Sequence, residues 1–397
     1  MPAGKDNSRR AAAFALAAWM ATKEHPSGLL PDGPDRAFVQ DIVYTAVRRL
    51  RALRFVLGKL VAKRPKGELE ALLLVGAAQI LYMPDVPDFA AVSETVEAAK
   101  MSNRSAASFV NGVLRNLLRR RAELEASLAA EPLAGRESFP TELVTRWIAR
   151  YGEKSAEAMC KMFNEPAETF LAWKPGSGHE AFEKLPRATR VETVPGFAEG
   201  LFVVQDPATA GAVELCGVKP GMSALDLCAA PGGKTVQLAW RLGGKGRLVA
   251  AEVNPERRRR LAENVARCAP GAAEIVEAPA DGELFDVVLA DVPCSNTGVF
   301  RRRPDARWNW SAKKLGELAS LQAEIADKAA AHVAPGGALV YSTCSLEPEE
   351  NRMQVDAFLA RHPDFAAAGE AESLPFDTGK DGAYACRLER RGRTEKI

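Results

Sequence analysis

The chain of 397 residues is longer than one hydrophobic core usually serves, so we expect two or three domains. Its hydrophobic fraction of 47%, charged fraction of 26% and net charge of +2 are ordinary for a soluble globular protein; they exclude a polycation but not a local basic surface. Seven cysteines without a Cys-x-x-Cys pair and four histidines without a His-x-x-x-His pair argue against a disulfide framework and a metal site, and favour a reducing cytoplasm. No apolar run approaches the roughly 18 residues of a membrane span.

Residues 1–130 are predicted to form an all-helical domain. Apolar residues recur at helical spacing over 38–57, and residues 72–80 are almost entirely apolar, which predicts a helix at the centre of a bundle. A further apolar face over 109–118 predicts the last helix. Residues 131–200 are predicted to be a linker, at 131–135, followed by a small α+β bridging subdomain.

From residue 201 to residue 397, short β-rich runs alternate with helical stretches. The predicted strands are 223–228, 247–252, 274–276, 286–291 and 338–342, and the predicted helices are 235–242, 255–268 and 315–332. Such alternation is typical of an α/β domain with a parallel, doubly wound sheet. Residues 383–388 alternate between apolar and polar side chains like an extra strand.

Residues 226–235 (Asp-Leu-Cys-Ala-Ala-Pro-Gly-Gly-Lys-Thr) combine a strand end, a glycine turn and a helix start. The glycines allow close approach of a ligand, and a helix N-terminus offers free N–H groups. Cys228 stands where a Walker A loop needs Gly, and no Gly-x-Gly-x-x-Gly is present. A small adenosyl ligand without a pyrophosphate fits best, S-adenosylmethionine for example. The candidate cofactor-binding residues of this loop are Cys228, Ala229, Ala230, Pro231, Gly232, Gly233 and Lys234.

Three acidic residues stand near the ends of predicted strands. Glu252 ends the second strand, where an acid typically receives a ribose diol; Asp281 precedes the fourth strand and can accept from an adenine amino group; Asp291 ends that strand. One such acid alone would be read as a helix cap or a salt bridge. Three of them beside a glycine turn favour a ligand site. Within residues 257–260, a run of four arginines on an exposed helix face, Arg257 could brace the loop.

Two cysteines occupy distinctive turns. Cys294 lies in Asp-Val-Pro-Cys-Ser-Asn-Thr-Gly (291–298) and Cys344 in Tyr-Ser-Thr-Cys-Ser-Leu-Glu-Pro (341–348), each directly after a predicted buried strand. Two strand ends of one sheet can deliver both thiols to one cleft. Methyl transfer to carbon 5 of a pyrimidine needs such a site, because a thiolate that adds at C6 makes C5 nucleophilic. Asp291 could hydrogen-bond the ring at N3, and Lys234 could orient the ring or ribose. The remaining cysteines are predicted to pack as small apolar side chains.

These motifs resemble a known family. Residues 201–390 resemble the RNA (cytosine-5) methyltransferases that use two cysteines, through residues 204–210, 226–235, 291–298, 342–351 and 381–385. Residues 9–121 resemble the helical NusB RNA-binding module, through residues 92–100 and 109–116. This layout is similar to that of the RsmB/Sun-type methyltransferases of 16S ribosomal RNA.

The resemblance implies a NusB-like domain followed by a Rossmann-like class I methyltransferase domain. It implies S-adenosylmethionine as methyl donor, Cys344 as nucleophile and Cys294 as the residue that assists product release. The expected partner is RNA, either naked or in an early small-subunit particle; a monomer without membrane association is expected.

Basic clusters are compatible with a polyanionic partner. Arg301, Arg302 and Arg303 follow the Cys294 turn and could hold phosphates beside the target base, whereas the clusters at 48–51 and 119–121 could equally be solvated helix faces. Three other functions make different predictions for this sequence. A non-enzymatic assembly factor predicts loss of a cysteine or of the glycine turn, and neither is lost. A DNA methyltransferase is opposed by the second cysteine and the helical module. A transfer RNA substrate is separable only by mapping.

Overall fold

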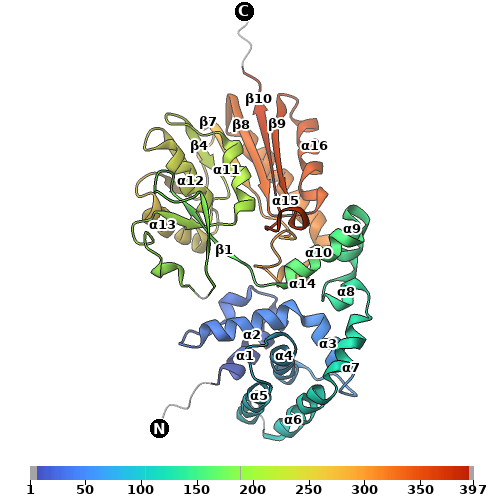
Figure 1. Cartoon of the computed structure of the whole chain (residues 1–397). Helices are drawn as coiled ribbons and strands as arrows, with labels where there is room; N and C mark the ends of the chain where they lie inside the picture. The colour runs from blue at the N-terminus through green and yellow to red at the C-terminus, as the bar shows by residue number, and fades with distance from the viewer. Residues whose placement is uncertain (1–6, 103, 188, 393–397) are drawn as a thin grey trace, which may run out of the picture. The chain divides into compact units, whose positions relative to one another are not determined.

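The computed structural model describes residues 7–102, 104–187 and 189–392. The chain divides into two compact units (Figure 1). The first consists of Met1–Glu165 together with Arg303–Asn309, and the second of Pro166–Arg302 together with Trp310–Ile397. This division differs from the boundaries expected at residues 130 and 200: the helices after residue 130 join the first unit, and the strands after residue 165 join the second.

The first unit is helical, as predicted. Its central helix α4 packs against α1, α2, α3, α5 and α6, and it is buried along most of its length because residues 71–78 are all apolar or glycine. The core around it consists of residues from α1 to α7. The elements of the unit are α1 (Ser8–Thr22), η1 (Pro26–Leu29), α2 (Arg36–Arg48), α3 (Leu50–Gly58), α4 (Gly67–Tyr82), α5 (Asp88–Ser102), α6 (Arg104–Arg119), α7 (Arg121–Ala129), α8 (Leu133–Arg136), α9 (Thr141–Tyr151), α10 (Glu153–Asn164) and α14 (Ala306–Asn309).

The linker predicted at residues 131–135 is wrong. Leu133–Arg136 form the short helix α8, and Leu133 and Ala134 are each only 5% exposed. The proline and glycine of this stretch suggested a flexible connection, but its two apolar side chains bury themselves in the first unit.

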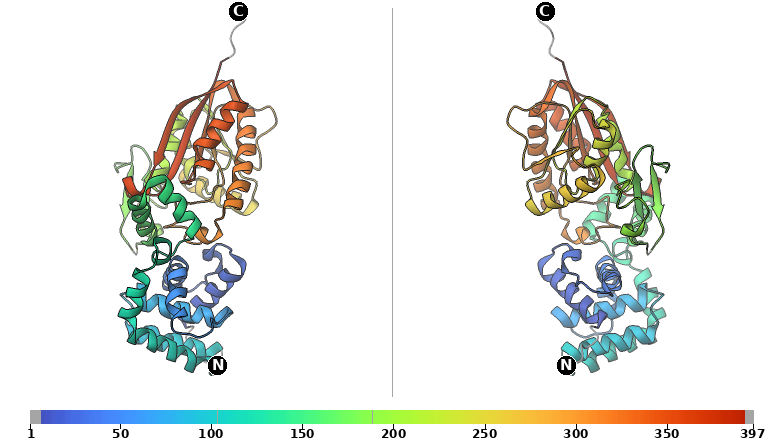
Figure 2. Two further views of the ribbon diagram at one scale, coloured as in Figure 1. Left: turned by 90° about the vertical axis from the view of Figure 1, so that its right-hand side faces the viewer. Right: turned by 90° about the vertical axis from the view of Figure 1, so that its left-hand side faces the viewer.

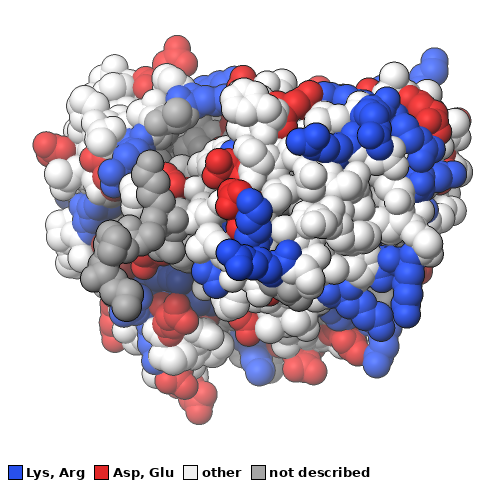
Figure 3. Space-filling view, turned by 90° about the horizontal axis from the view of Figure 1, so that it is seen from below, with Lys and Arg blue, Asp and Glu red and all other residues white. Residues whose placement is uncertain are grey.

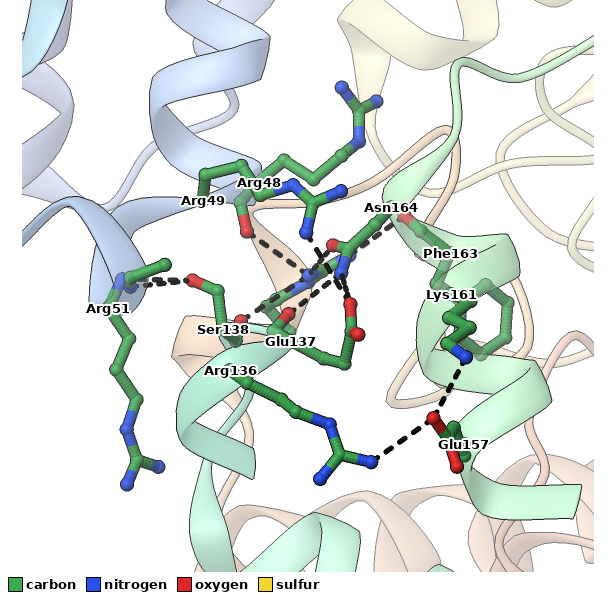
Figure 4. A network of polar contacts seen from close by, with 12 residues as sticks. Arg48, Arg49, Arg51, Arg136, Glu137, Ser138, Glu157, Lys161, Phe163 and Asn164 are labelled. Carbon is green, nitrogen blue, oxygen red and sulfur yellow. Dashed lines mark hydrogen bonds and ion pairs between the residues drawn. The ribbon is translucent and has the colours of Figure 1, made fainter. Parts of the chain in front are cut away.

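The short segment 303–309 belongs to the first unit although it comes late in the chain. Arg307 is fully buried there and donates hydrogen bonds to the carbonyls of Arg48 (3.2 Å), Ser138 (3.4 Å) and Phe163 (3.0 Å) and to Asn164 Oδ1 (2.9 Å). Figure 4 shows the polar network among Arg48, Ser138 and Asn164. The segment is therefore anchored by directional contacts as well as by apolar packing.

The second unit contains two sheets. Its main sheet has seven strands in the order β6-β5-β4-β7-β8-β10-β9; the strands from β6 to β8 are parallel, and β10 is antiparallel to both β8 and β9. The smaller antiparallel sheet has the order β2-β1-β3. The strands are β1 (Thr169–Trp173), β2 (Phe182–Leu185), β3 (Phe202–Val204), β4 (Ser223–Asp226), β5 (Arg247–Ala251), β6 (Glu274–Val276), β7 (Phe285–Asp291), β8 (Val333–Thr343), β9 (Phe365–Ser373) and β10 (Ala383–Arg390).

Helices cover both faces of the main sheet (Figure 2). Helices α15 and α16 pack on one face through Ala326, Ala329 and Phe358, and α11 and α12 pack on the other through Val213 and Leu238. The elements of this unit besides the strands are η2 (Val191–Thr193), η3 (Pro207–Thr209), α11 (Ala210–Cys216), α12 (Gly233–Leu242), α13 (Pro255–Cys268), α15 (Ala312–Ala331), η4 (Pro348–Glu350), α16 (Arg352–Arg361) and α17 (Pro375–Thr378).

The predicted parallel sheet and the extra strand at 383–388 are confirmed. Strand β9 was not predicted, because its alternation of alanine and glutamate lacks the large apolar residues of a strand. Among the residues that the structure describes, no helix combines the length and the hydropathy that a bilayer crossing requires.

Candidate active site

The two distinctive cysteines meet at the carboxyl ends of neighbouring parallel strands. Strand β7 delivers Cys294 and strand β8 delivers Cys344, with Asp291 paired in register with Ser342. The Sγ atoms are 3.3 Å apart, within hydrogen-bonding distance of sulfur. Cys344 Sγ also lies 3.4 Å from Oδ1 of Asn296, a residue held at a positive φ of 60°. The predicted juxtaposition of the thiols is therefore observed.

Two glycines allow the cysteine turns to approach each other. Gly298 N–H donates to Cys344 O (3.0 Å), and Gly382 N–H, just before β10, donates to Gly298 O (2.7 Å). A Cβ atom on Gly298 would lie 2.6 Å from Gly382 O and 2.8 Å from Cys344 O, which real side chains do not tolerate. Backbone-to-backbone packing therefore sets the spacing between the two turns and the start of β10.

A cavity of about 260 Å³ opens beside Cys344 and is lined by Lys234, Asp291, Thr343 and Tyr384 among others. Lys234 Nζ lies 2.6 Å from Asp291 Oδ2, and Ser342 Oγ donates to Asp291 Oδ1 at 2.7 Å. Burial opposes the charge of Lys234, but the nearby acids, Asp291 foremost, together raise its pKa above the ordinary value. Lys234 therefore stays a cation, and the cavity carries a fixed donor and a fixed acceptor next to one thiol.

The two thiols have different surroundings. Cys344 lines the cavity, and Cys294 is not among the lining residues that the structure describes. The hydrogen bond with Cys344, then burial, then the negative charge of Glu350 raise the pKa of Cys294 well above that of a free thiol. The surroundings of Cys294 therefore favour its thiol form over a thiolate.

The glycine turn lies at the end of β4. Gly232 has a φ of 107°, and a Cβ atom there would lie 3.0 Å from Leu261 Cδ1, so the turn needs glycine. No side chain caps the first N–H groups of α12, which begins at Gly233. The backbone thus presents unsatisfied donors to this end of the sheet.

Glu252 and Arg257 contact each other beside the glycine turn, and the ribose contact of Glu252 stays a prediction. Glu252 is 4% exposed, accepts from Asn254 N–H (3.0 Å) and pairs with Arg257 (3.4 Å). Arg257 also donates to Ala230 O (3.0 Å), so it braces the glycine turn against α13. A buried carboxylate at the end of β5, next to uncapped N–H groups, fits the ribose and carboxylate of an adenosyl amino acid.

Asp226 is a buried carboxylate at the site that the sequence did not single out. It is 1% exposed; one carboxyl oxygen accepts from Thr235 Oγ1 (2.6 Å), and the other is buried without a hydrogen-bond partner among the described residues. Burial raises its pKa to about 7. Its position at the start of the glycine-turn stretch, residues 226–235, is the sequence feature that could have identified it.

The other candidates of the cofactor end vary in exposure. Burial raises the pKa of Cys228 to about 12, so this thiol is not a nucleophile at neutral pH. Asp281 is exposed in the loop between β6 and β7, and its contact with adenine stays a prediction. The four cysteines expected in the core are buried: Cys160, Cys216, Cys268 and Cys386.

Each of the three arginines after the Cys294 turn has a protein partner. Arg302 forms ion pairs with Asp206 (2.7 Å) and Asp381 (2.5 Å). Arg301 is 8% exposed and donates to the carbonyl of residue 166 (3.2 Å), and Arg303 pairs with Asp305 (3.0 Å). Their contact with phosphates stays a prediction, but the structure gives Arg302 an internal role that the sequence analysis did not assign.

Comparisons with known proteins agree with this geometry. The family "16S rRNA methyltransferase RsmB/F" matches residues 215–384, and the NusB family matches residues 6–119. The chain is 33% identical to the ribosomal RNA small subunit methyltransferase B of Klebsiella pneumoniae, over 97% of this chain and 98% of the relative. The corresponding protein of Vibrio cholerae is 34% identical, with coverages of 97% and 98%. The chain belongs to the RsmB/F methyltransferase family.

Solved structures share the fold of this RsmB/F family member. The crystal structure of PH0851 superimposes with a TM-score of 0.79 at 22% identity, over 97% of this chain and 98% of that one. NSun6 from Pyrococcus horikoshii, solved with SFG, gives a TM-score of 0.56 at 18% identity, over 64% and 99%. The predicted fold class is confirmed, and the protein is an S-adenosylmethionine-dependent methyltransferase.

Proposed function

We propose that this protein methylates carbon 5 of a cytosine in small-subunit ribosomal RNA. The observation that carries the proposal is the pair of thiols 3.3 Å apart, one of which lines a cavity together with Lys234 and Asp291. The names of the matched family and of the relatives from Klebsiella pneumoniae and Vibrio cholerae support ribosomal RNA as the substrate class. A purely structural role is not favoured, because both cysteines and the glycine turn are retained. The names of the relatives, which refer to ribosomal RNA, favour that substrate over transfer RNA.

Each cavity residue has a separate role in the reaction of the cytosine ring. Cys344 Sγ, as a thiolate, forms a bond to C6, and the electron pair of the C5–C6 double bond moves to make C5 nucleophilic. The carboxyl group of Asp291 donates a hydrogen bond to N3, which carries no proton in cytosine and gains negative charge in the addition, and Lys234 holds Asp291 in place through their 2.6 Å contact. When bound at the glycine turn and Glu252, S-adenosylmethionine supplies an electrophilic methyl group.

Product release needs the C5 proton to leave and the bond between Cys344 and C6 to break. Cys294 acts as the donor to Cys344 in this scheme, and the hydrogen bond and burial that raise its pKa support that role. Its S–H therefore stabilises the Cys344 thiolate as it is expelled. Cys344 is the nucleophile in this scheme, since it lines the cavity.

Substitution of each cysteine tests these roles. Cys344→Ala should abolish both methylation and any covalent RNA adduct. Cys294→Ser should accumulate a protein–RNA adduct that survives denaturing electrophoresis, because a serine hydroxyl is a much weaker acid than a thiol and is a poor proton source for the leaving thiolate. An adduct in the Cys344→Ala protein, or free turnover by the Cys294→Ser protein, would contradict the assignment.

RNA contact by the first unit is part of the proposal. A groove of about 890 Å³ on α5 and α6 is lined by apolar side chains and by Lys100, Arg115 and Arg119. The face of the molecule in Figure 3 carries Lys and Arg in several separate groups, with uncharged surface and acidic residues between them. Such groups supply sequence-independent, salt-sensitive affinity. We further propose that the protein acts as a cytoplasmic monomer.

The target nucleotide can be found by mapping. Bisulfite sequencing of total cellular RNA, with and without the gene, should reveal one cytosine of the small-subunit ribosomal RNA that loses its protection. Loss of protection only in transfer RNA would overturn the proposed substrate.

A further inference from the structure

Glu350 is a fully buried carboxylate beneath the two cysteine turns. It ends the short helix η4, has no exposed surface and receives hydrogen bonds at both side-chain oxygens. Oε1 accepts from Ser295 N–H (2.8 Å) and from Gln322 Nε2 (3.0 Å). Oε2 accepts from the hydroxyls of Ser295 (2.5 Å) and Ser345. These donors are uncharged, and a buried carboxylate held by neutral donors alone is uncommon.

The partners of Glu350 link it to both turns. Ser295 directly follows Cys294, and Ser345 directly follows Cys344. Gln322, which is fully buried on α15, also donates to Pro293 O (2.9 Å), the carbonyl just before Cys294. The carboxylate therefore ties the residues that flank the two thiols to one rigid group.

The backbone of Glu350 is fixed as well. Tyr341 OH, on the strand that delivers Cys344, donates to Glu350 O at 2.7 Å. The neighbouring Asn351 accepts from Thr343 Oγ1 (2.6 Å) and donates to Ser345 O (2.9 Å). Because η4 is held to the β8 end by these contacts, its carboxylate cannot follow the Cys294 turn if that turn shifts.

We propose that Glu350 is a positioning residue that sets the spacing of the two thiols and places a buried negative charge beneath the Cys294 turn. The inference rests on the proposed function and extends it to a residue that does not touch the base. Its geometric part follows from the four hydrogen bonds, since loss of the carboxylate frees the Cys294 turn from the Cys344 turn.

The electrostatic part follows from the groups that face Cys294. These are Cys344, whose Sγ lies 3.3 Å from that of Cys294, the carboxylate of Glu350, and the phenol of Tyr341. The negative charge of Glu350 acts against a thiolate at Cys294 and so leaves the thiolate to Cys344. Glu350 thus separates the roles of two otherwise similar cysteines.

Phenylarsine oxide measures the thiol spacing without RNA or S-adenosylmethionine. The reagent condenses with two neighbouring thiols, forming two As–S bonds and releasing one water molecule, and binding can be followed by intact mass under native conditions. Wild-type protein should bind one equivalent, and Cys294→Ser and Cys344→Ala should lose this equivalent. Glu350→Ala should weaken binding by at least about tenfold, because it removes several hydrogen bonds to a charged group.

The conservative variants separate geometry from charge. Glu350→Gln can keep its carbonyl towards Ser295 N–H and turn its amide towards the two hydroxyls, so it should bind the arsenical like wild type. Should Glu350→Ala not fold, Glu350→Asp gives the same information, because it keeps the charge but shortens the side chain by one methylene group. Leu388→Ala, buried at the far end of β10, serves as the control for general destabilisation.

The charge is tested in a Cys344→Ala background, where Cys294 can be alkylated alone. The rate of its reaction with iodoacetamide rises with pH as the thiolate forms. The midpoint of this rise should lie at a lower pH when Glu350 is replaced by Gln. An unchanged pH profile would overturn the electrostatic part, and wild-type arsenical affinity in a folded Glu350→Ala or Glu350→Asp protein would overturn the geometric part. Neither result depends on methyl transfer, so both can fail while the proposed function stands.

Discussion

Replacement of Arg302 by methionine tests whether this arginine is an internal clamp. Its guanidinium lies 2.7 Å from Asp206 Oδ2 and 2.5 Å from Asp381 Oδ2, and it also donates to Glu168 O (2.7 Å). The exposed fractions of the side chains are 29% for Arg302, 6% for Asp206 and 1% for Asp381. Methionine keeps the aliphatic bulk but leaves two buried carboxylates without their cation.

The magnitude follows from this burial. Removal of one partner from a buried ion pair destabilises a protein by about 3–5 kcal/mol. For a folding unit of roughly 200 residues, such a loss lowers the Tm by about 10 °C. Burial already raises the pKa of Asp381, and the loss of Arg302 should raise this pKa further.

Scanning calorimetry of the purified protein measures the effect. The matched control is Arg352→Met, since Arg352 is 53% exposed and forms its ion pairs with Asp356 and Glu370 at the surface. Exposed pairs contribute little to stability, so their loss should shift the Tm by less than about 3 °C. Asp381→Asn added to Arg302→Met should recover part of the stability. Equal shifts for Arg302→Met and Arg352→Met would refute the clamp.

Three further predictions concern other buried groups. Asp226→Asn should change the pH dependence of stability. The folded pKa of about 7 lies above the ordinary 3.8, so the contribution of Asp226 to wild-type stability falls as pH rises from 3.8 to 7. Over this range the free energy of urea unfolding of the variant should rise relative to wild type by about 1.4 kcal/mol per pH unit, and a constant difference between the two proteins would contradict the prediction. Glu252→Ala should weaken binding of S-adenosylmethionine in calorimetric titrations by roughly tenfold or more, whereas the exposed Glu256→Ala should not. Arg307→Met should destabilise the first unit by on the order of 3 kcal/mol, because it removes four hydrogen bonds from the interior. An unchanged thermal transition would argue against that.

Part of the site could be read from local sequence. The turns that carry Cys294 and Cys344 follow apolar runs that form adjacent strands β7 and β8, and parallel strands place their carboxyl ends on one edge. The glycine turn before α12 and the acid at the end of β5 follow from the same rule. These features depend on residues close together in the chain, which is why periodicity and motif spacing predicted them.

Other features depend on contacts between distant residues. Arg302 was interpreted as a phosphate contact, yet two acids 96 and 79 residues away pair with it. The stretch around α8 was read as a linker from its proline and glycine, but its apolar side chains bury against the first unit. Glu350 lies within residues 342–351, but nothing in its local sequence shows that it lies under both cysteines.

By itself, the sequence determined the class of each unit, the order of its main elements and the chemistry of the paired thiols, because these follow from hydrophobic periodicity and from short motifs. Only the tertiary structure decided which thiol lines the cavity and which has surroundings that raise its pKa. That difference comes from burial, from the 3.3 Å approach of the two sulfur atoms and from the charge of Glu350. Each of these is a property of packing between segments about 50 residues apart along the chain, where local sequence patterns carry no information.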